Sequence, residues 1–238
     1  MRGMFALFLC VGIAAATSAR AEDRIGDTIT AKNQVTAKLG VILRPLATGD
    51  GVSASETVRT GPSSAAVLRF LDNTNLNIGA SSTVLLDSFV YNPDSSTKTA
   101  VLNLTKGAMR FVTGKSDPAN FVIKTQVATL GIRGTDFVVL NNGDSTSSVV
   151  VNRGLVSVCP HDRAKFDETC QDGYQLDVKH NATTIGANGK NSGPQTLPAA
   201  TVAQLLNALD SGTNLKLGNL VIGVPQIFPT TPRSSSPH

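Results

Sequence analysis

Short apolar runs separated by turn residues make up the chain from Gln34 onward. In the run SSAAVLRFL, which begins at Ser63, alternation places Leu68 and Phe70 on one face of a strand. Similar runs rich in β-branched residues recur at intervals of about 8–12 residues, with turn signals between them. Residues 34–158 contain no amphipathic helical pattern of useful length. The pattern predicts an all-β domain over 34–158, built as a short-stranded sandwich or a solenoid-like β module.

A loose repetition occurs inside this region. Lys106-Gly107, Arg153-Gly154 and Asp172-Gly173 each precede an alternating run, as if each pair opened a new strand. A two-fold repetition of strand units would produce this rhythm, and chance resemblance between β patterns would produce it equally well.

The pattern of short apolar runs ends after residue 158. Residues 159–196 hold two cysteines and a Gly- and Asn-rich stretch, which predicts a disulfide loop and a linker. Residues 197–211 predict one helix, with Pro198 near its start, Gly212 as its stop, and an apolar stripe at Val202, Leu205, Leu206 and Leu209. We expect 212–238 to form an apolar segment and a disordered tail.

The N-terminus has the pattern of a secretory signal peptide at residues 1–21. Arg2 precedes an apolar run, and Ala19 and Ala21 are the small residues of a cleavage site after Ala21. The run is short for a membrane span, and no second apolar stretch of spanning length follows. We therefore expect a periplasmic or secreted protein without a transmembrane span in its mature chain.

Charge and composition limit the partners. Removing residues 1–21 takes away Arg2 and Arg20 and no acidic residue, so 21 basic residues become 19 against 17 acidic ones and the charge is about +2. Nucleic-acid binding requires a clustered basic face, so we expect no nucleic-acid partner. Tryptophan is absent and only 2 tyrosines occur, so surfaces for stacking sugars or bases are scarce.

Two cysteines remain in the mature chain, Cys159 and Cys170. An oxidising compartment favours a disulfide between them, and two separate thiols are the alternative. His161 and His180 lie near enough in sequence to suggest a zinc site, but the spacing fits no standard zinc motif. Acidic residues around the loop suggest a solvated surface more than a calcium site, because the EF-hand spacing is missing. We expect no metal, no cofactor and no catalytic residue.

The densest motif is TLGIRGTDFVV, from Thr129 to Val139. A dinucleotide site or phosphate loop would need a helix after the glycines, and an RNA clamp would need helices on both sides, but a strand pattern follows. The motif residues are Gly131, Arg133, Gly134, Thr135, Asp136 and Phe137. We expect the glycines to allow a tight turn or bulge, Arg133 and Thr135 to bond to backbone or carboxylate groups, and Phe137 to point inward. A ligand- or partner-facing role is the alternative.

Taken together, several blocks resemble the FecR-type domain of bacterial envelope proteins, over roughly Val35 to Val158. The blocks are VRT at Val58, SAAVLRF at Ser64, LTKGAMR at Leu104, IKT at Ile123 and ATLGIRGTDF at Ala128. The chain has Asp72-Asn73-Thr74 where the family often has Asp-Gly-Ser/Thr, and asparagine tolerates the left-handed backbone of such a turn.

The resemblance implies an all-β extracytoplasmic module with no catalytic residues. We therefore expect an exported non-enzymatic binding or regulatory module, acting in envelope sensing or signalling through another envelope protein, a small ligand or a glycan. The alternative is a structural component of an envelope or surface assembly, onto which the helix and the apolar C-terminal segment would dock.

Overall fold

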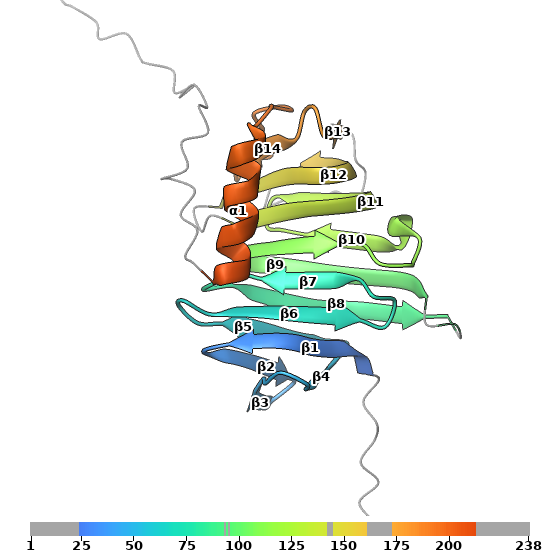
Figure 1. Ribbon diagram of the computed structural model, residues 1–238. Coiled ribbons are helices and arrows are strands. Elements are labelled where there is room, and N and C mark those ends of the chain that lie inside the picture. The colour runs from blue at the N-terminus through green and yellow to red at the C-terminus, as the bar shows by residue number, and fades with distance from the viewer. Residues whose placement is uncertain (1–23, 93, 95, 142–144, 161–172, 213–238) are drawn as a thin grey trace, which may run out of the picture.

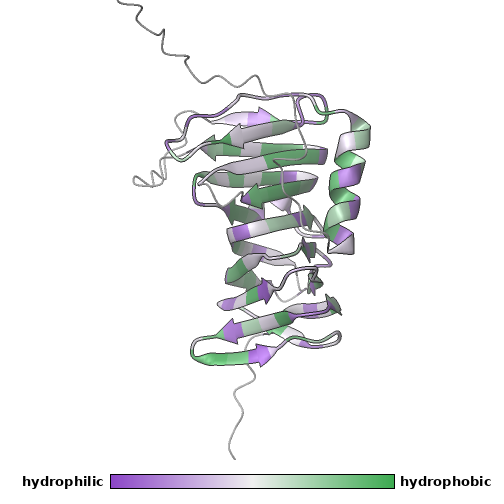
Figure 2. Ribbon diagram, turned by 90° about the vertical axis from the view of Figure 1, so that its left-hand side faces the viewer, coloured by the Kyte–Doolittle hydropathy of each residue, from purple (hydrophilic) through white to green (hydrophobic). Residues whose placement is uncertain are grey.

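The computed structural model describes residues 24–92, 94, 96–141, 145–160 and 173–212. Within these residues, fourteen strands form one sheet that folds over into two packed layers, and one α-helix lies against one of the layers (Figure 1). A 3-10 turn, η1 (Pro118–Asn120), precedes β10 (Phe121–Lys124). Viewed from the side, the helix stands on one side of the stack of strands and the opposite side has no helix (Figure 2). The all-β prediction is confirmed. The predicted signal peptide at 1–21 lies outside the described residues, as does the C-terminal segment after Gly212.

The layer without the helix is called the open layer. Its complete strands are β2 (Val35–Leu39), β3 (Ile42–Pro45), β5 (Glu56–Thr60), β8 (Thr83–Tyr91), β10 (Phe121–Lys124) and β13 (Tyr174–Leu176). The layer under the helix is called the helix-side layer. Its complete strands are β1 (Arg24–Lys32), β4 (Gly51–Ser53), β6 (Ala65–Phe70), β7 (Asn75–Ile78) and β14 (Ala182–Ile185).

Three long strands pass from one layer to the other: β9 (Thr97–Val112), β11 (Ala128–Asn141) and β12 (Ser147–Pro160). One half of β9 pairs with β8 and β10, and its other half pairs with β7 and β11. Each strand contains a glycine with positive φ at the crossing, namely Gly107 (φ 85°), Gly134 (φ 60°) and Gly154 (φ 87°). Such angles strongly favour glycine. The pairs Lys106-Gly107 and Arg153-Gly154 therefore mark bends within long strands, and the prediction that they open new short strands is wrong.

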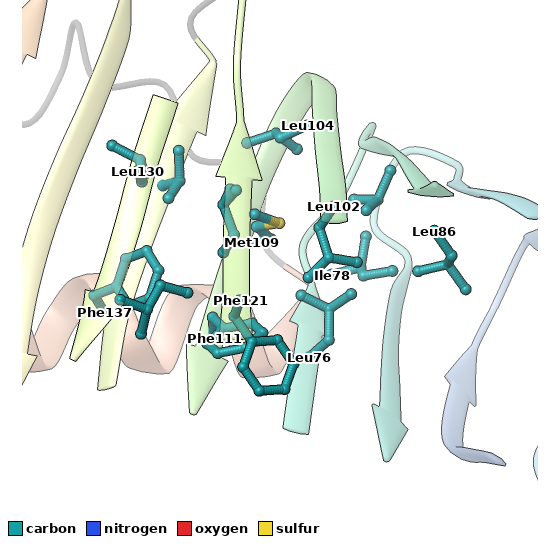
Figure 3. Packing of buried hydrophobic residues seen from close by; sticks show 14 of the residues in the cluster. Leu76, Ile78, Leu86, Leu102, Leu104, Met109, Phe111, Phe121, Leu130 and Phe137 are labelled. Atoms are coloured by element: carbon teal, nitrogen blue, oxygen red, sulfur yellow. The ribbon is translucent and has the colours of Figure 1, made fainter. Parts of the chain in front are cut away.

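The main core lies between the two layers. Phe111 is central to it, with its ring centroid 5.1 Å from that of Phe121 and 5.8 Å from that of Phe137 (Figure 3). The alternation predicted for the run at Ser63 is confirmed, because Leu68 and Phe70 of β6 are buried. Side chains of both layers thus meet in one hydrophobic cluster.

The predicted helix is present as α1 (Ala199–Ser211), between Pro198 and Gly212, whose φ of 73° ends it. Its apolar stripe packs on the outer surface of the helix-side layer, burying Val202, Leu205 and Leu209. The strand halves beneath, such as Val149 to Val151, are therefore buried on both faces, which explains their continuous apolar sequence.

Two boundaries differ from the prediction. β1 belongs to the sheet and pairs with β6 and β4, so the fold includes residues before 34. The predicted linker within 159–196 contributes β13 and β14, both paired with β12. β13 is the strand that the alternating run after Gly173 had indicated, whereas β14 was not predicted. The expected turn at Asp72-Asn73-Thr74 is confirmed: Asn73 has φ 65°, and the buried Asp72 carboxylate accepts hydrogen bonds from the Thr74 amide and hydroxyl, both at 2.9 Å.

Candidate functional site

The motif around Gly131 lies in a single strand, β11, and extends into both layers. Thr129 to Arg133 pair with β12 in the open layer, and Asp136 to Asn141 pair with β9 in the helix-side layer. The register against β12 shifts between Arg133 and Asp136, so the predicted bulge is present, but within one strand and not between two. The motif therefore consists of two parts that face different surroundings.

Asp136 belongs to the part in the helix-side layer. Its carboxylate accepts two hydrogen bonds from the Arg110 guanidinium, at 2.8 and 2.9 Å, and one from the Asn152 side-chain amide at 2.8 Å. The side chains of Asp136 and Arg110 are 8% and 20% exposed. A two-point contact between arginine and carboxylate is strong and fixes the orientation of both groups. These bonds tie β11 to β9 and β12.

The charge of this site follows from the same contacts. Burial alone raises the pKa of Asp136, but the hydrogen bonds from Arg110 and Asn152 and the positive charge of Arg110 outweigh it, so the pKa lies below its usual value. The bond from Asp136 in turn raises the pKa of Arg110 against the effect of burial. The pair is thus held in its ionised form.

Arg110 also connects the motif to the helix. Its second terminal nitrogen lies 3.5 Å from the Asp210 carboxylate of α1. Asn77 of β7 donates to the other oxygen of Asp210 at 2.6 Å, and Lys32 of β1 donates to the backbone carbonyl of Ser211 at 2.6 Å. The end of α1 is therefore held by polar bonds to several strands, in addition to its apolar stripe.

Thr135 and Phe137 act as parts of the framework. The Thr135 amide donates to the Thr113 hydroxyl at 2.9 Å, and Thr113 returns two bonds to the Thr135 carbonyl, both at 3.0 Å. The Thr135 hydroxyl is buried without a hydrogen-bond partner among the described residues. Phe137 is fully buried, as expected. The bonds expected of Thr135 are thus made by its backbone and not by its side chain.

Arg133 differs from the prediction: its side chain is exposed, and within the described residues it bonds to no backbone or carboxylate group. The arginine that is mostly buried and bonded to the motif carboxylate is Arg110. It was not among the predicted site residues, and neither were its neighbours Asn152 and Asp210. Alternation in β9 was an available signal: Met109 and Phe111 face the core, so Arg110 must point to the opposite surface.

Gly131 and Arg133 lie on the outer surface of the open layer. Gly131 pairs with Val122 of β10 and Ser157 of β12, and a Cβ added to it would approach only the Ser157 Cβ, at 3.7 Å, which is ordinary contact. Its φ is not positive. Neither strain nor crowding therefore requires glycine here, in contrast to Gly134.

This outer surface, called the open face, is basic and lacks aromatic side chains. Its outward positions include Thr36, Lys38, Thr57, Arg59, Thr83, Leu85, Asp87, Val101, Asn103, Thr105, Val122, Lys124, Thr129, Gly131, Arg133, Leu155, Ser157, Cys159 and Gln175. Asp87 is the acidic residue among these positions, and it accepts a bond from Asn103 at 2.9 Å.

The cysteine and histidine predictions are tested only in part. Cys159 is half-buried near the end of β12, whereas Cys170 and His161 lie outside the described residues, so the disulfide stays a prediction. His180 lies 3.7 Å from Asp177 at an exposed site. Within the described ranges, no three histidine, cysteine or acidic side chains gather as metal ligands, and no helix is long and apolar enough to cross a membrane.

Comparison with known proteins supports the FecR resemblance. The family model described as FecR protein matches residues 56–157. No curated protein sequence matches the chain. The match covers the strands from β5 to most of β12, including both parts of the motif. It supports a regulatory or signalling module.

Solved structures give a weaker likeness. Two crystal structures of a candidate anti-sigma factor from Parabacteroides distasonis ATCC 8503 are similar, each with 16% sequence identity. Their TM-scores are 0.46 and 0.45, and the similarity covers 63% of this chain and 63% or 64% of theirs. The chain thus spans less than two thirds of these relatives, and the likeness concerns the fold alone.

Proposed function

We propose that this protein is an exported, non-enzymatic FecR-type binding or regulatory module, which acts in envelope sensing or signalling by engaging another protein through its open face. The observation that carries the proposal is the FecR match over residues 56–157, because that segment supplies most of the open face. The open face is also the large sheet surface that no described helix covers (Figure 2).

The chemistry of the open face favours a protein partner over a glycan. Sugar rings bind well on aromatic side chains, and the outward positions of the open layer have none. They offer hydroxyl and amide groups together with Lys38, Arg59, Lys124 and Arg133. Complementary charge favours a partner that presents acidic side chains.

Arg110 and Asp136 support a non-enzymatic role. A general acid or base needs a titratable group that can reach a substrate and exchange a proton near neutral pH. The Asp136 carboxylate instead accepts hydrogen bonds from Arg110 and Asn152, and its pKa is lowered further from neutrality. The pair joins strands and helix.

The position of α1 argues against the structural alternative. That alternative requires the apolar stripe of the helix to dock on an assembly. The stripe residues Val202, Leu205 and Leu209 are buried against the protein's own sheet. Docking them elsewhere would require the helix to leave that sheet.

Site-specific photo-cross-linking in the producing cell tests the proposed function. A benzophenone amino acid replaces Arg133 or Ser157 on the open face, and as a matched control it replaces Arg69, which is exposed on the helix-side layer. We expect adducts with a discrete envelope protein from positions 133 and 157 and none from 69. Adducts of equal yield from all three positions, or none from the open face, would contradict the proposal.

Export is tested separately by intact-mass spectrometry. Cleavage after Ala21 should produce a chain that begins at Glu22, recovered from the periplasm or the medium. A protein that retains Met1 and remains in the cytoplasm would refute this part.

A further inference from the structure

The hairpin formed by β2 and β3 ends in an exposed apolar tip. Val41 is 95% exposed, and Ile42 and Leu43 are each 62% exposed. The hairpin forms one end of the stack of strands (Figure 1), where β3 pairs only with β2 among the described residues. Three consecutive large apolar side chains in water on a protruding turn are typical of an interaction site.

The directions in which Val41, Ile42 and Leu43 point indicate which kind of partner could cover the tip. Leu43 pairs with Lys38 and Ile42 pairs with Leu39, so Leu43 shares the outward side of the hairpin with Lys38, and Ile42 points to the opposite side. Val41 lies at the turn. The tip is therefore apolar on both faces and at its end.

A flat protein surface would cover one face of such a tip. A second copy of the chain that paired along the edge of β3 would satisfy backbone groups of the strand but would leave Val41 at the turn in water. The interfacial region of a bilayer surrounds an inserted turn on all sides, and it accepts apolar side chains from every direction.

The charge next to the tip fits a bilayer with anionic lipid. Lys38 is exposed beside Leu43, and its aliphatic stem can extend along the apolar tip while its ammonium group reaches lipid phosphates. Arg44, the next basic residue, is already held by Glu56 at 2.8 Å and by the Gly51 carbonyl at 2.8 Å. Lys38 is thus the cation that is placed to meet the headgroups.

We propose that the β2–β3 hairpin inserts its tip, Val41 to Leu43, into the surface of an anionic lipid bilayer. The inserted residues are at one end of the stack, so the open face, apart from Lys38 beside the tip, then stands away from the bilayer and stays accessible. This inference rests on the hairpin alone and does not depend on the identity of the protein partner.

Tryptophan fluorescence tests the insertion directly, because the chain contains no tryptophan. A reporter is introduced by Val41→Trp, or as a matched control by Val178→Trp, a 59% exposed position between β13 and β14. Both are made in residues 22–238, since the described fold begins at Arg24. The vesicles contain phosphatidylethanolamine and phosphatidylglycerol with brominated acyl chains.

Insertion predicts a blue shift and bromine quenching for the position 41 reporter and neither for the position 178 reporter. No response at position 41 overturns the proposal. Equal responses at both positions also overturn it, because they indicate general adsorption. Blue-shifted emission at position 41 without vesicles, in a sedimenting dimer, would show that a second copy covers the tip and would overturn it as well.

A second pair of variants measures the contribution of the tip. Ile42→Ser with Leu43→Ser should weaken partitioning into these vesicles on the order of tenfold. The matched control, Val90→Ser with Val178→Ser, changes residues that are 49% and 59% exposed and should leave partitioning unchanged. The C-terminal apolar segment is present in all variants, so it cannot produce the difference. Equal partitioning of both variants overturns the proposal, and thermal melts verify that both are folded.

Discussion

Replacing Asp136 with alanine tests whether the carboxylate of the motif holds the fold together. The wild-type side chain is 8% exposed and accepts three hydrogen bonds, two from Arg110 and one from Asn152. Alanine removes all of them. It leaves a guanidinium that is 20% exposed, with Asp210 at 3.5 Å as its remaining acidic neighbour.

The size of the stability loss depends on the contacts that Arg110 retains in the variant. Removing one partner of a fully buried ion pair costs about 3–5 kcal/mol, because the other charge remains buried and unpaired. Arg110 retains some contact with water and with Asp210, so the loss should lie below the upper part of that range. We expect Asp136→Ala to lower the free energy of unfolding by about 2–3 kcal/mol.

Urea denaturation followed by far-UV circular dichroism measures this change. Asp27→Ala is the matched control, because Asp27 pairs with Arg24 at the surface, where the side chains are 36% and 59% exposed. An exposed pair contributes about 0–1 kcal/mol, so the control should change little. A loss below about 0.5 kcal/mol for Asp136→Ala, or equal losses for both variants, would refute the structural role assigned to this carboxylate.

Three further predictions concern stability. Gly154→Ala should destabilise the fold more than Gly134→Ala in the same urea titration. Both positions have positive φ, so alanine adds a strain of about 1–2 kcal/mol at either one. A Cβ at 154 would also overlap the Gly134 carbonyl oxygen, whereas the nearest atom to a Cβ at 134 is a Pro118 carbon at 4.0 Å. Leu209→Ala should cost about 2–5 kcal/mol, because its fully buried side chain joins α1 to the sheet, and a loss under 1 kcal/mol would show that the helix is not held there. Because the pKa of Asp136 is lowered in the folded state, its ionised carboxylate stabilises the fold fully above about pH 4, the ordinary aspartate pKa. This stabilisation is lost as the pH falls from there through the folded pKa. When the melting temperature is measured against pH in acid, it should therefore fall less steeply in Asp136→Ala than in wild type.

Local patterns in the sequence predicted the element types well. Alternation identified the buried side of β6, the apolar stripe and the stop at Gly212 predicted α1, and the turn chemistry of asparagine predicted the left-handed Asn73. Each of these features depends on residues that are close in sequence. They could therefore be recognised without the fold.

The features that were missed depend on contacts between distant segments. Gly107 and Gly154 resemble turn signals locally, and only the pairing of each strand half with a different layer shows that the strand continues through the bend. Arg133 was expected to bond to backbone or carboxylate groups, whereas the arginine that binds the Asp136 carboxylate is Arg110 of β9. Alternation in β9 shows that Arg110 points away from the core, but only the pairing of β9 with β11 shows that the Asp136 carboxylate lies beside it.

We propose two separate roles for the motif: Asp136 and its neighbours stabilise the fold, and Arg133 with Gly131 faces a partner. Arg133→Glu tests this most directly when its melting temperature is measured together with the cross-link yield from a benzophenone at position 157. We predict a melting temperature equal to that of wild type and a cross-link yield that is strongly reduced, because Arg133 is exposed on a basic face. An unchanged cross-link yield, or a loss that occurs only together with a lower melting temperature, would show that Arg133 does not face a partner.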